Sequence, residues 1–217
     1  MARGEGMSSK VAVLQALRSK IRGIECAVVE RPRVYVASLF PELDDALPGG
    51  GLPLGTFVEV LVEREGSGAL SLALKLARAA VAQRPAWAVV DTEQSFYPLA
   101  AAQAGLNLDN LIVVQTEPRR AAWAFSQLLR APFVGASFLV SRSMDNMTFR
   151  RFQLAAERGG GLGFIVRPVE ASKRPCWASV RLKIQRAGFA QSARLRTTLL
   201  HVRNGNLAAP VCLDLDA

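Results

Sequence analysis

Histidine, cysteine and long apolar runs are scarce in this chain of 217 residues, and each shortage excludes a class of function. The single histidine, His201, has no acid or cysteine close to it in the sequence, so no catalytic triad is indicated. Cys26, Cys176 and Cys212 lie far apart without C-x-x-C spacing, which argues against a disulfide framework or a zinc site. We therefore expect neither a metal nor a cofactor.

Apolar segments are also too short for a membrane span, because none approaches the roughly 20 residues that cross a bilayer. The opening residues, MARGEGMSSK, are polar and lack the apolar core of a signal peptide. The expectation is a cytoplasmic protein without membrane contact. A hydrophobic content of 50% is enough for a substantial core.

Acidic residues are scarce in the second half of the chain. Residues 119–217 carry 16 Lys and Arg against 5 Asp and Glu, whereas residues 1–118 carry 11 against 13. This excess favours binding to a polyanion or an acidic protein, and a solvated basic face is the alternative. Arginine dominates and pairs with phosphate and carboxylate alike, so nucleic acid and protein both stay open as partners. The candidate residues are Arg150, Arg151, Arg181, Lys183, Arg194, Arg196 and Arg203.

The middle of the chain alternates short apolar runs with helical patterns. Apolar strands alternating with helices indicate an α/β fold with a mostly parallel sheet covered on both faces. The expected strands are 56–62, 86–91, 110–115, 136–141 and 162–168, and the expected helices are 69–83, 97–105, 119–130 and 146–160.

Near the C-terminus the pattern changes to period two. In ASVRLKIQ (178–185) apolar residues alternate with polar ones, which predicts a strand with one wet face that carries Arg181 and Lys183. Residues 193–203 resemble a partner strand across a loop at 186–192. We expect the two to form an antiparallel hairpin at the edge of the sheet.

The N-terminal part has a helical stripe and an extended linker. Apolar residues recur in helical spacing over 8–22, and 26–39 is extended and broken by Pro32. We divide the chain into an N-terminal helix and linker (1–35), a core (36–205) and a tail (206–217). The apolar residues of the stripe are Val11, Leu14, Leu17 and Ile21, and Val34 and Val36 lie in the following extended segment.

The stretch EREGSGAL (63–70) stands where a phosphate-binding loop would lie, between an apolar strand and a helix. Such a loop reads G-x-x-x-x-G-K-[ST]. Here Glu63 replaces the first glycine, Gly68 is in place, Ala69 replaces the lysine and Leu70 replaces the hydroxyl residue. The degenerate site comprises Glu63, Glu65, Gly66, Gly68, Ala69 and Leu70.

Two longer stretches around this loop resemble the core of the RecA recombinases. They are VASLFPELDDALPGGGLPLGTFVEV (36–60) and WAVVDTEQSFYPLAAAQAGLNLDNLIVVQ (87–115). The resemblance implies a RecA-like fold and an ATP site. Ala69 and Leu70 can hold neither phosphate nor Mg²⁺, and the acidic Glu63 and Glu65 would repel a triphosphate.

Two further positions follow from the same resemblance. The aspartate that orients the metal in RecA-like ATPases corresponds to Ser141, so we expect the nucleotide site to be empty. Glu93 matches the family's water-activating carboxylate. We interpret it as a relic, or as a structural carboxylate that accepts hydrogen bonds at a strand end.

The chain also resembles the ImuA family, the RecA-like accessory proteins of the bacterial mutasome. The similar segments are GGGLPLG (49–55), GSGALSLALKLA (66–77), FYPLAAAQAGLNLDNLIVVQ (96–115), RAAWAFSQLLR (120–130), RRFQLAAERGGGLGFIVRP (150–168) and RPCWASVRLKI (174–184). The resemblance implies a non-enzymatic role in damage-induced translesion synthesis. The implied partners are RecA, an ImuB-type inactive polymerase homologue and an error-prone C-family polymerase.

Several alternatives remain at this point. In RecA the corresponding helix and strand contact the neighbouring protomer, so the resemblance implies a RecA-type protomer contact, with a RecA protomer or a second copy of this chain, through Val11, Leu14, Leu17, Ile21, Val34 and Val36. The alternative is that the helix packs back on its own core. The basic second half contacts DNA, contacts an acidic partner, or only solubilises the protein. A SulA-like division inhibitor that binds FtsZ, and a RecA paralogue with residual nucleotide or DNA binding, are the alternative functions.

Overall fold

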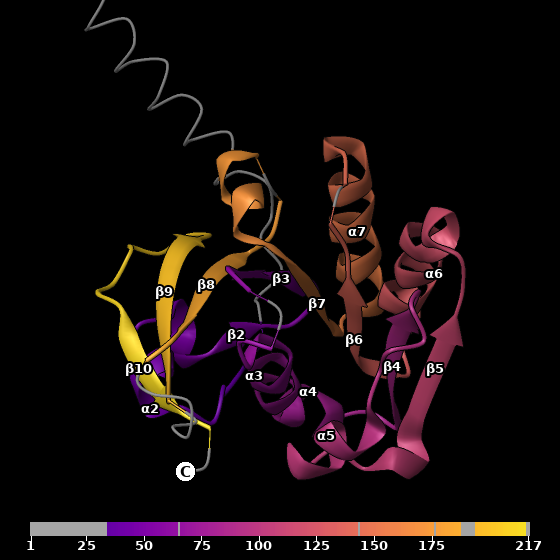
Figure 1. The fold of residues 1–217 in the computed structure, drawn as a ribbon, viewed down its shortest axis with the longest axis horizontal. Helices are drawn as coiled ribbons and strands as arrows, with labels where there is room; N and C mark the ends of the chain where they lie inside the picture. Colours follow the sequence, from indigo (N-terminus) through magenta and orange to yellow (C-terminus); the bar gives the residue numbers. More distant parts are fainter. Residues whose placement is uncertain (1–33, 65, 143, 176, 188–193, 216–217) are drawn as a thin grey trace, which may run out of the picture. The chain divides into compact units, whose positions relative to one another are not determined.

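The computed structural model describes residues 34–64, 66–142, 144–175, 177–187 and 194–215, and their main sheet lies between two layers of helices (Figure 1). The strand order in this eight-stranded sheet is β10-β9-β8-β3-β7-β6-β4-β5. The strands are β3 (Thr56–Val62), β4 (Ala86–Asp91), β5 (Leu111–Gln115), β6 (Val134–Val140), β7 (Leu162–Pro168), β8 (Val180–Arg186), β9 (Arg194–Val202) and β10 (Val211–Asp214).

The centre of the sheet is parallel, and its C-terminal strands are antiparallel. β3 lies between β7 and β8 and runs parallel to both, and β6, β4 and β5 continue the parallel part. β9 pairs antiparallel with β8 and with β10. Near-continuous apolar runs suit strands that are covered on both faces. The predicted α/β fold with a C-terminal antiparallel hairpin is confirmed.

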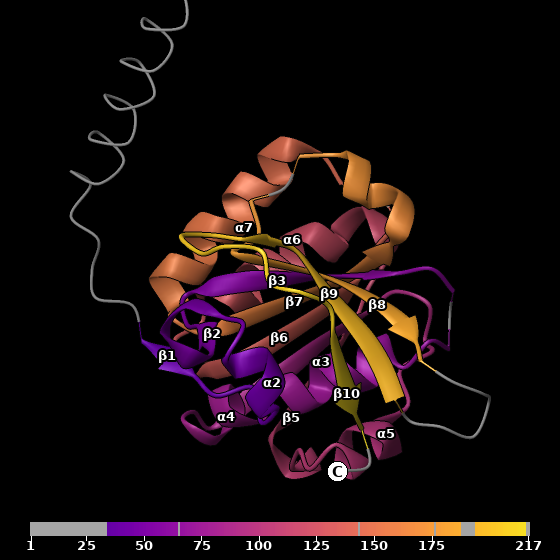
Figure 2. The same ribbon diagram turned by 90° about the vertical axis from the view of Figure 1, so that its left-hand side faces the viewer.

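Helices cover the two faces of the sheet in separate groups, as the edge-on view in Figure 2 shows. On one face lie α3 (Ala69–Leu76), α4 (Arg78–Ala82) and α5 (Pro98–Gln103), which share a hydrophobic cluster with the sheet. On the other lie α6 (Pro118–Arg130) and α7 (Asn146–Gly159), which contribute to a second cluster around Phe125, Phe149 and Phe152.

Short elements complete the described part of the chain. β1 (Tyr35–Val36) pairs antiparallel with β2 (Leu52–Pro53), and α2 (Pro41–Asp44) and η1 (Pro48–Gly50) lie between them in sequence. η2 (Leu108–Asn110) precedes β5, and η3 (Val169–Lys173) follows β7. A β-carbon at Gly51 would lie 2.2 Å from the carbonyl oxygen of Val36, so the β1–β2 pairing requires glycine there.

The structure differs from the sequence-based expectations in three places. The helix expected over 69–83 is two helices, α3 and α4, separated at Ala77. The hairpin is not at the edge, because the unpredicted β10 covers β9. Val36 is buried in the chain's own core at 3% exposure, so it is not presented to a partner as expected, whereas Val34 is 60% exposed.

The other four residues that were predicted to contact a RecA protomer belong to the predicted N-terminal helix. Val11, Leu14, Leu17 and Ile21 lie outside the described residues. Among the residues that the structure describes, no helix combines the length and the apolar character needed to cross a membrane.

Candidate functional site

The degenerate loop occupies the predicted place, between the end of β3 and the start of α3. Gly66 and Gly68 adopt left-handed backbone conformations with φ of 73° and 85°, which favour glycine. The two residues that replace the lysine and the hydroxyl residue pack against the protein's own core. Ala69 is 3% exposed, and Leu70 packs against the core on the α3 side of the sheet. A strand–loop–helix unit is therefore present without the side chains that bind Mg-nucleotide.

Glu63, at the start of this loop, is neutralised by the neighbouring strand β8. Its Oε1 lies 2.8 Å from Nζ of Lys183 and accepts a hydrogen bond of 2.9 Å from Nε2 of Gln185. The hydrogen bond and charge of Lys183 lower the pKa of the Glu63 carboxyl, against the opposing effect of desolvation. Two sets of residues predicted separately, the loop and the basic face, thus meet in one ion pair.

The loop is also covered by the C-terminal strands. A β-carbon at Gly68 would lie 3.3 Å from Cδ2 of Leu195 in β9 and 3.5 Å from Cδ1 of Leu215, just after β10. Lys75 of α3 donates a hydrogen bond from Nζ to the carbonyl oxygen of Leu215. The segment after β10 is thereby tied to the helix that, in a nucleotide-binding loop, begins at the phosphates.

Ser141 follows β6, and its backbone N–H donates to the carbonyl oxygen of Val166 in β7 over 3.0 Å. Because β7 separates β6 from β3, Ser141 lies at the end of the second strand from the degenerate loop. A serine at this position supplies no carboxylate for a metal ion.

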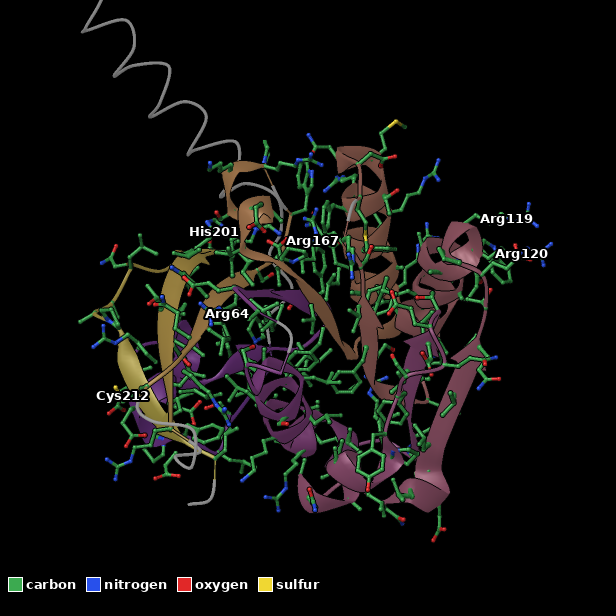
Figure 3. The ribbon with its side chains drawn as sticks, viewed as in Figure 1. Arg64, Arg119, Arg120, Arg167, His201 and Cys212 are labelled. Atoms are coloured by element: carbon green, nitrogen blue, oxygen red, sulfur yellow. The ribbon has the colours of Figure 1, made fainter. Side chains whose placement is uncertain are left out.

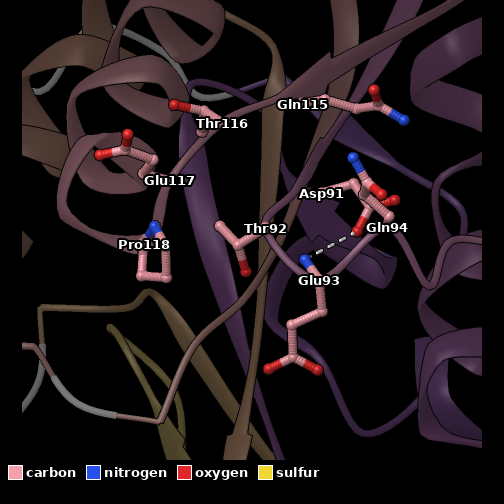
Figure 4. Close-up of a pocket in the computed structure, with 8 residues that line it drawn as sticks. All are labelled: Asp91, Thr92, Glu93, Gln94, Gln115, Thr116, Glu117 and Pro118. Carbon is pink, nitrogen blue, oxygen red and sulfur yellow. Dashed lines mark hydrogen bonds between the residues drawn. The ribbon is translucent and has the colours of Figure 1, made fainter.

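Asp91, rather than Glu93, is the acid whose carboxylate holds the backbone that follows β4. The Glu93 side chain is exposed. Asp91 is 8% exposed, and its carboxylate accepts hydrogen bonds from the backbone N–H groups of Glu93, Ser95 and Phe96 over 3.3, 3.2 and 3.1 Å. No described residue donates to the Glu93 carboxylate, which points away from Asp91 in Figure 4. The structural role that the sequence suggested for Glu93 belongs to Asp91.

An open pocket of about 490 Å³ lies at the carboxyl ends of β4 and β5. Figure 4 shows the residues that line it, which are Asp91, Thr92, Glu93, Gln94, Gln115, Thr116, Glu117 and Pro118. None of the loop residues that the structure describes contributes to this lining. Glu93 and the loop, which the resemblance to RecA placed in one site, therefore do not share this pocket.

Arg181 is not on a wet face, and this part of the sequence-based prediction is wrong. Its side chain is 11% exposed, and Nε donates to the carboxylate of Glu59 on the adjacent strand β3. Nη1 and Nη2 donate to the carbonyl oxygens of Ser172 and Arg174 over 3.1 and 3.0 Å. The η3 segment covers this face of β8, which a strand pattern alone does not reveal.

Glu59 also binds a second arginine, Arg167 of β7, and the three residues form a buried ion cluster. Nη1 of Arg167 lies 2.8 Å from Oε1 of Glu59, with side-chain exposures of 1% and 0%. The Arg167 guanidinium also stacks 5.0 Å from the ring centre of Phe149. Sequence reasoning missed this cluster. The available signal was a single charge inside each apolar run, FVEVLV (57–62) and GFIVRP (163–168).

The other basic candidates are divided between α7 and the C-terminal strands. Arg150 and Arg151 are exposed on α7, and Arg194 and Arg196 are exposed on β9. Arg194 pairs with Asp214 over 3.3 Å. Arg203 follows β9 and is half-buried. Figure 3 shows how an outward arginine such as Arg119 of α6 differs from the enclosed Arg167.

His201 of β9 is exposed at the surface and lies among cations. Partial burial, followed by the charges of Arg181 and Arg203, lowers the pKa of His201 below its usual value. Among the described residues, no group of three His, Cys, Asp or Glu side chains is arranged to hold a metal ion.

The comparison with known families agrees with this geometry. Residues 31–133 match the family model of the RecA N-terminal domain. The matched range runs through β1, the degenerate loop, Asp91 and α6, so it contains the strand–loop–helix unit. Together with the mostly parallel sheet and its C-terminal hairpin, the match supports a RecA-like fold for this chain.

Proposed function

We propose that this chain is a non-catalytic RecA-related accessory protein of the ImuA type. It would bind RecA and the translesion polymerase components, support error-prone synthesis across damaged DNA and limit RecA filament activity. The observation that carries the proposal is the degenerate loop, in which Glu63 is paired with Lys183 and Gly68 is covered by Leu195 and Leu215. A RecA-like domain whose nucleotide loop is built into its own packing is suited to binding rather than to ATP turnover.

The mechanism that we propose is mimicry of a RecA protomer. A RecA-like surface would bind the end of a RecA filament, and the lack of a functional nucleotide loop would prevent further extension. The loop positions Ala69 and Leu70 support this, because ATP-dependent assembly needs the lysine and the hydroxyl that they replace.

The test is a filament assembly assay with RecA, single-stranded DNA and ATP, followed by light scattering, with the full chain added at stoichiometric ratios. We expect slower or shorter filaments. Unchanged assembly would overturn the mimicry mechanism. A parallel pull-down with RecA, an ImuB-type polymerase homologue and FtsZ, with and without nuclease, separates the functions. Capture of FtsZ alone supports a SulA-like division inhibitor, and capture that nuclease abolishes supports a DNA-bound paralogue.

A further inference from the structure

One exposed surface combines apolar anchors with arginine and lysine side chains at the carboxyl end of the sheet. We call it the Trp177 ledge, and it consists of Met147, Arg150, Arg151, Lys173, Arg174 and Trp177. Trp177 is 43% exposed and Met147 is 71% exposed. η3 and the first turn of α7, which bear the ledge, lie at the same end of the molecule in Figure 1.

The tryptophan of the ledge is held in place from α7. The guanidinium carbon of Arg150 lies 4.9 Å from the centre of the Trp177 ring, a cation–π contact. Nη1 of Arg150 donates to Oε1 of Gln153 over 3.0 Å, and Gln153 is buried and donates in turn to Glu157 over 2.8 Å. A ring positioned in this way loses little conformational entropy when a partner covers it.

The chain segment that carries the ledge is anchored by the buried ion cluster. Arg181 donates to the carbonyl oxygens of Ser172 and Arg174, five and three residues before Trp177, while its Nε is paired with Glu59. The cluster contains two guanidinium groups and one carboxylate, so the protein beneath the ledge carries an excess of positive charge.

The surface charge of the ledge has the same sign. Arg150, Arg151, Lys173 and Arg174 are all exposed. The nearby acids are Glu157 and Glu170, which are exposed, and Asp145, whose carboxylate caps α7 by accepting from the Thr148 N–H over 2.6 Å. Cations therefore outnumber acids, and a partner that supplies carboxylates would find complementary charge.

We propose that the Trp177 ledge docks an acidic segment of a partner protein that places an aromatic or aliphatic side chain against Trp177 and Met147. Tryptophan, arginine and methionine are enriched at the centres of protein interfaces. One face of the Trp177 ring is already occupied by Arg150, and the second apolar anchor is a methionine rather than another ring. Binding of single-stranded nucleic acid relies on repeated aromatic stacking, which this composition does not offer.

The docking proposal specifies a kind of partner for the proposed accessory function. It rests on that function, because it assumes that the chain acts through protein contacts. Its test needs neither RecA nor a polymerase. The full chain is titrated against a fluorescein-labelled random copolymer of glutamate and tyrosine, and binding is followed by fluorescence anisotropy. Polyglutamate and oligo-deoxythymidine serve as the charge-only and nucleic-acid probes.

Two matched variants locate the binding. The ledge variant carries Arg150→Glu, Arg151→Glu and Trp177→Ala. The control variant carries Arg119→Glu, Arg120→Glu and Trp123→Ala on α6, where all three residues are also exposed. We expect the ledge variant to bind the copolymer about tenfold more weakly or worse, and the control to bind like the wild type. A second variant, Lys173→Glu with Arg174→Glu, leaves the Arg150–Trp177 contact intact and should also weaken binding.

The outcomes separate the alternatives. Equal losses in the ledge and control variants would overturn the proposal, because binding would then follow net charge alone. If polyglutamate bound as tightly as the copolymer, Trp177 and Met147 would have no role in binding, and the apolar part of the proposal would be wrong. Oligo-deoxythymidine binding that depends on the ledge, without copolymer binding, would assign the surface to nucleic acid. Because RecA is absent from this assay, a failure here is distinct from a failure of the RecA assembly assay.

Discussion

Arg167 donates from Nη1 to Oε1 of Glu59 across 2.8 Å, and both side chains are excluded from solvent beneath α7 and η3. Glu59 lies on the strand between β7 and β8, so one carboxylate joins three adjacent strands through Arg167 and Arg181. A buried charge is tolerated when it is paired and hydrogen-bonded, and each arginine here depends on the same acid.

Glu59→Gln should therefore destabilise the protein strongly. Removal of the only carboxylate in the cluster leaves two buried guanidinium groups without a counter-charge, at a cost of about 3–5 kcal/mol. Urea denaturation followed by circular dichroism measures the change in the free energy of unfolding. Glu63→Gln at the partly exposed pair with Lys183 is the control and should leave the midpoint nearly unchanged. Similar midpoints for the two variants would contradict the role of the cluster.

Asp91 and Glu93, two residues apart, should respond very differently to alanine. Asp91→Ala removes a buried carboxylate and leaves three partly buried backbone N–H groups without their acceptor, which should cost about 1–3 kcal/mol. Glu93→Ala removes an exposed carboxylate and should change stability by less than about 0.5 kcal/mol. Thermal unfolding of the two variants measures this contrast. A larger loss of stability in the Glu93 variant than in the Asp91 variant would show that Glu93 is the structural carboxylate.

The alternation of strands and helices was predictable from the sequence because buried parallel strands are almost entirely apolar. The strands at 86–91 and 162–168 were predicted with the bounds that the structure shows. β10 was not predictable, because VCLD is too short to display a period. Its identity as a strand comes from pairing with β9, which lies elsewhere in the sequence.

The sequence was sufficient to predict where the candidate site lies, but not which side chains contact one another there. The lost lysine and hydroxyl are visible in the sequence at Ala69 and Leu70. The pairing of Glu63 with Lys183 joins residues of different strands and could not be read from either strand alone. The burial of Arg181 depends on η3, whose sequence shows no sign that it covers β8.

The contact between α3 and the segment after β10 should stabilise the degenerate loop. Leu215 is partly buried against the core, so Leu215→Ala should cost about 1–2 kcal/mol. Hydrogen exchange of the Gly66 and Gly68 amides should become faster, because Leu215 lies over Gly68. Leu207→Ala is the control, since that side chain is 64% exposed. Unchanged exchange in the Leu215 variant would show that the loop is held without the C-terminal segment.

His201 should make the protein less stable as the medium becomes mildly acidic. Its pKa in the folded state lies below the ordinary value of 6.5, because burial and the charges of Arg181 and Arg203 oppose protonation. The unfolded chain therefore binds the proton more readily, so this contribution is fully present above pH 6.5 and is lost as the pH falls towards the folded pKa. In His201→Gln, unfolding free energies measured between about pH 8 and pH 5.5 should show a flatter dependence. An unchanged slope would mean that other groups titrate in this range.

The nucleotide loop should stay empty even when its missing side chains are restored. Isothermal titration of the full chain with Mg-ATP is expected to show no binding at micromolar concentrations. The variant Ala69→Lys with Leu70→Thr should gain none, because position 69 is buried and Leu195 and Leu215 cover the neighbouring Gly68. A buried lysine there should instead lower the melting temperature. Micromolar Mg-ATP binding by the unaltered chain would overturn the non-catalytic assignment. Binding gained only by the variant would show that packing over the loop is no obstacle and that the two side chains alone account for the loss.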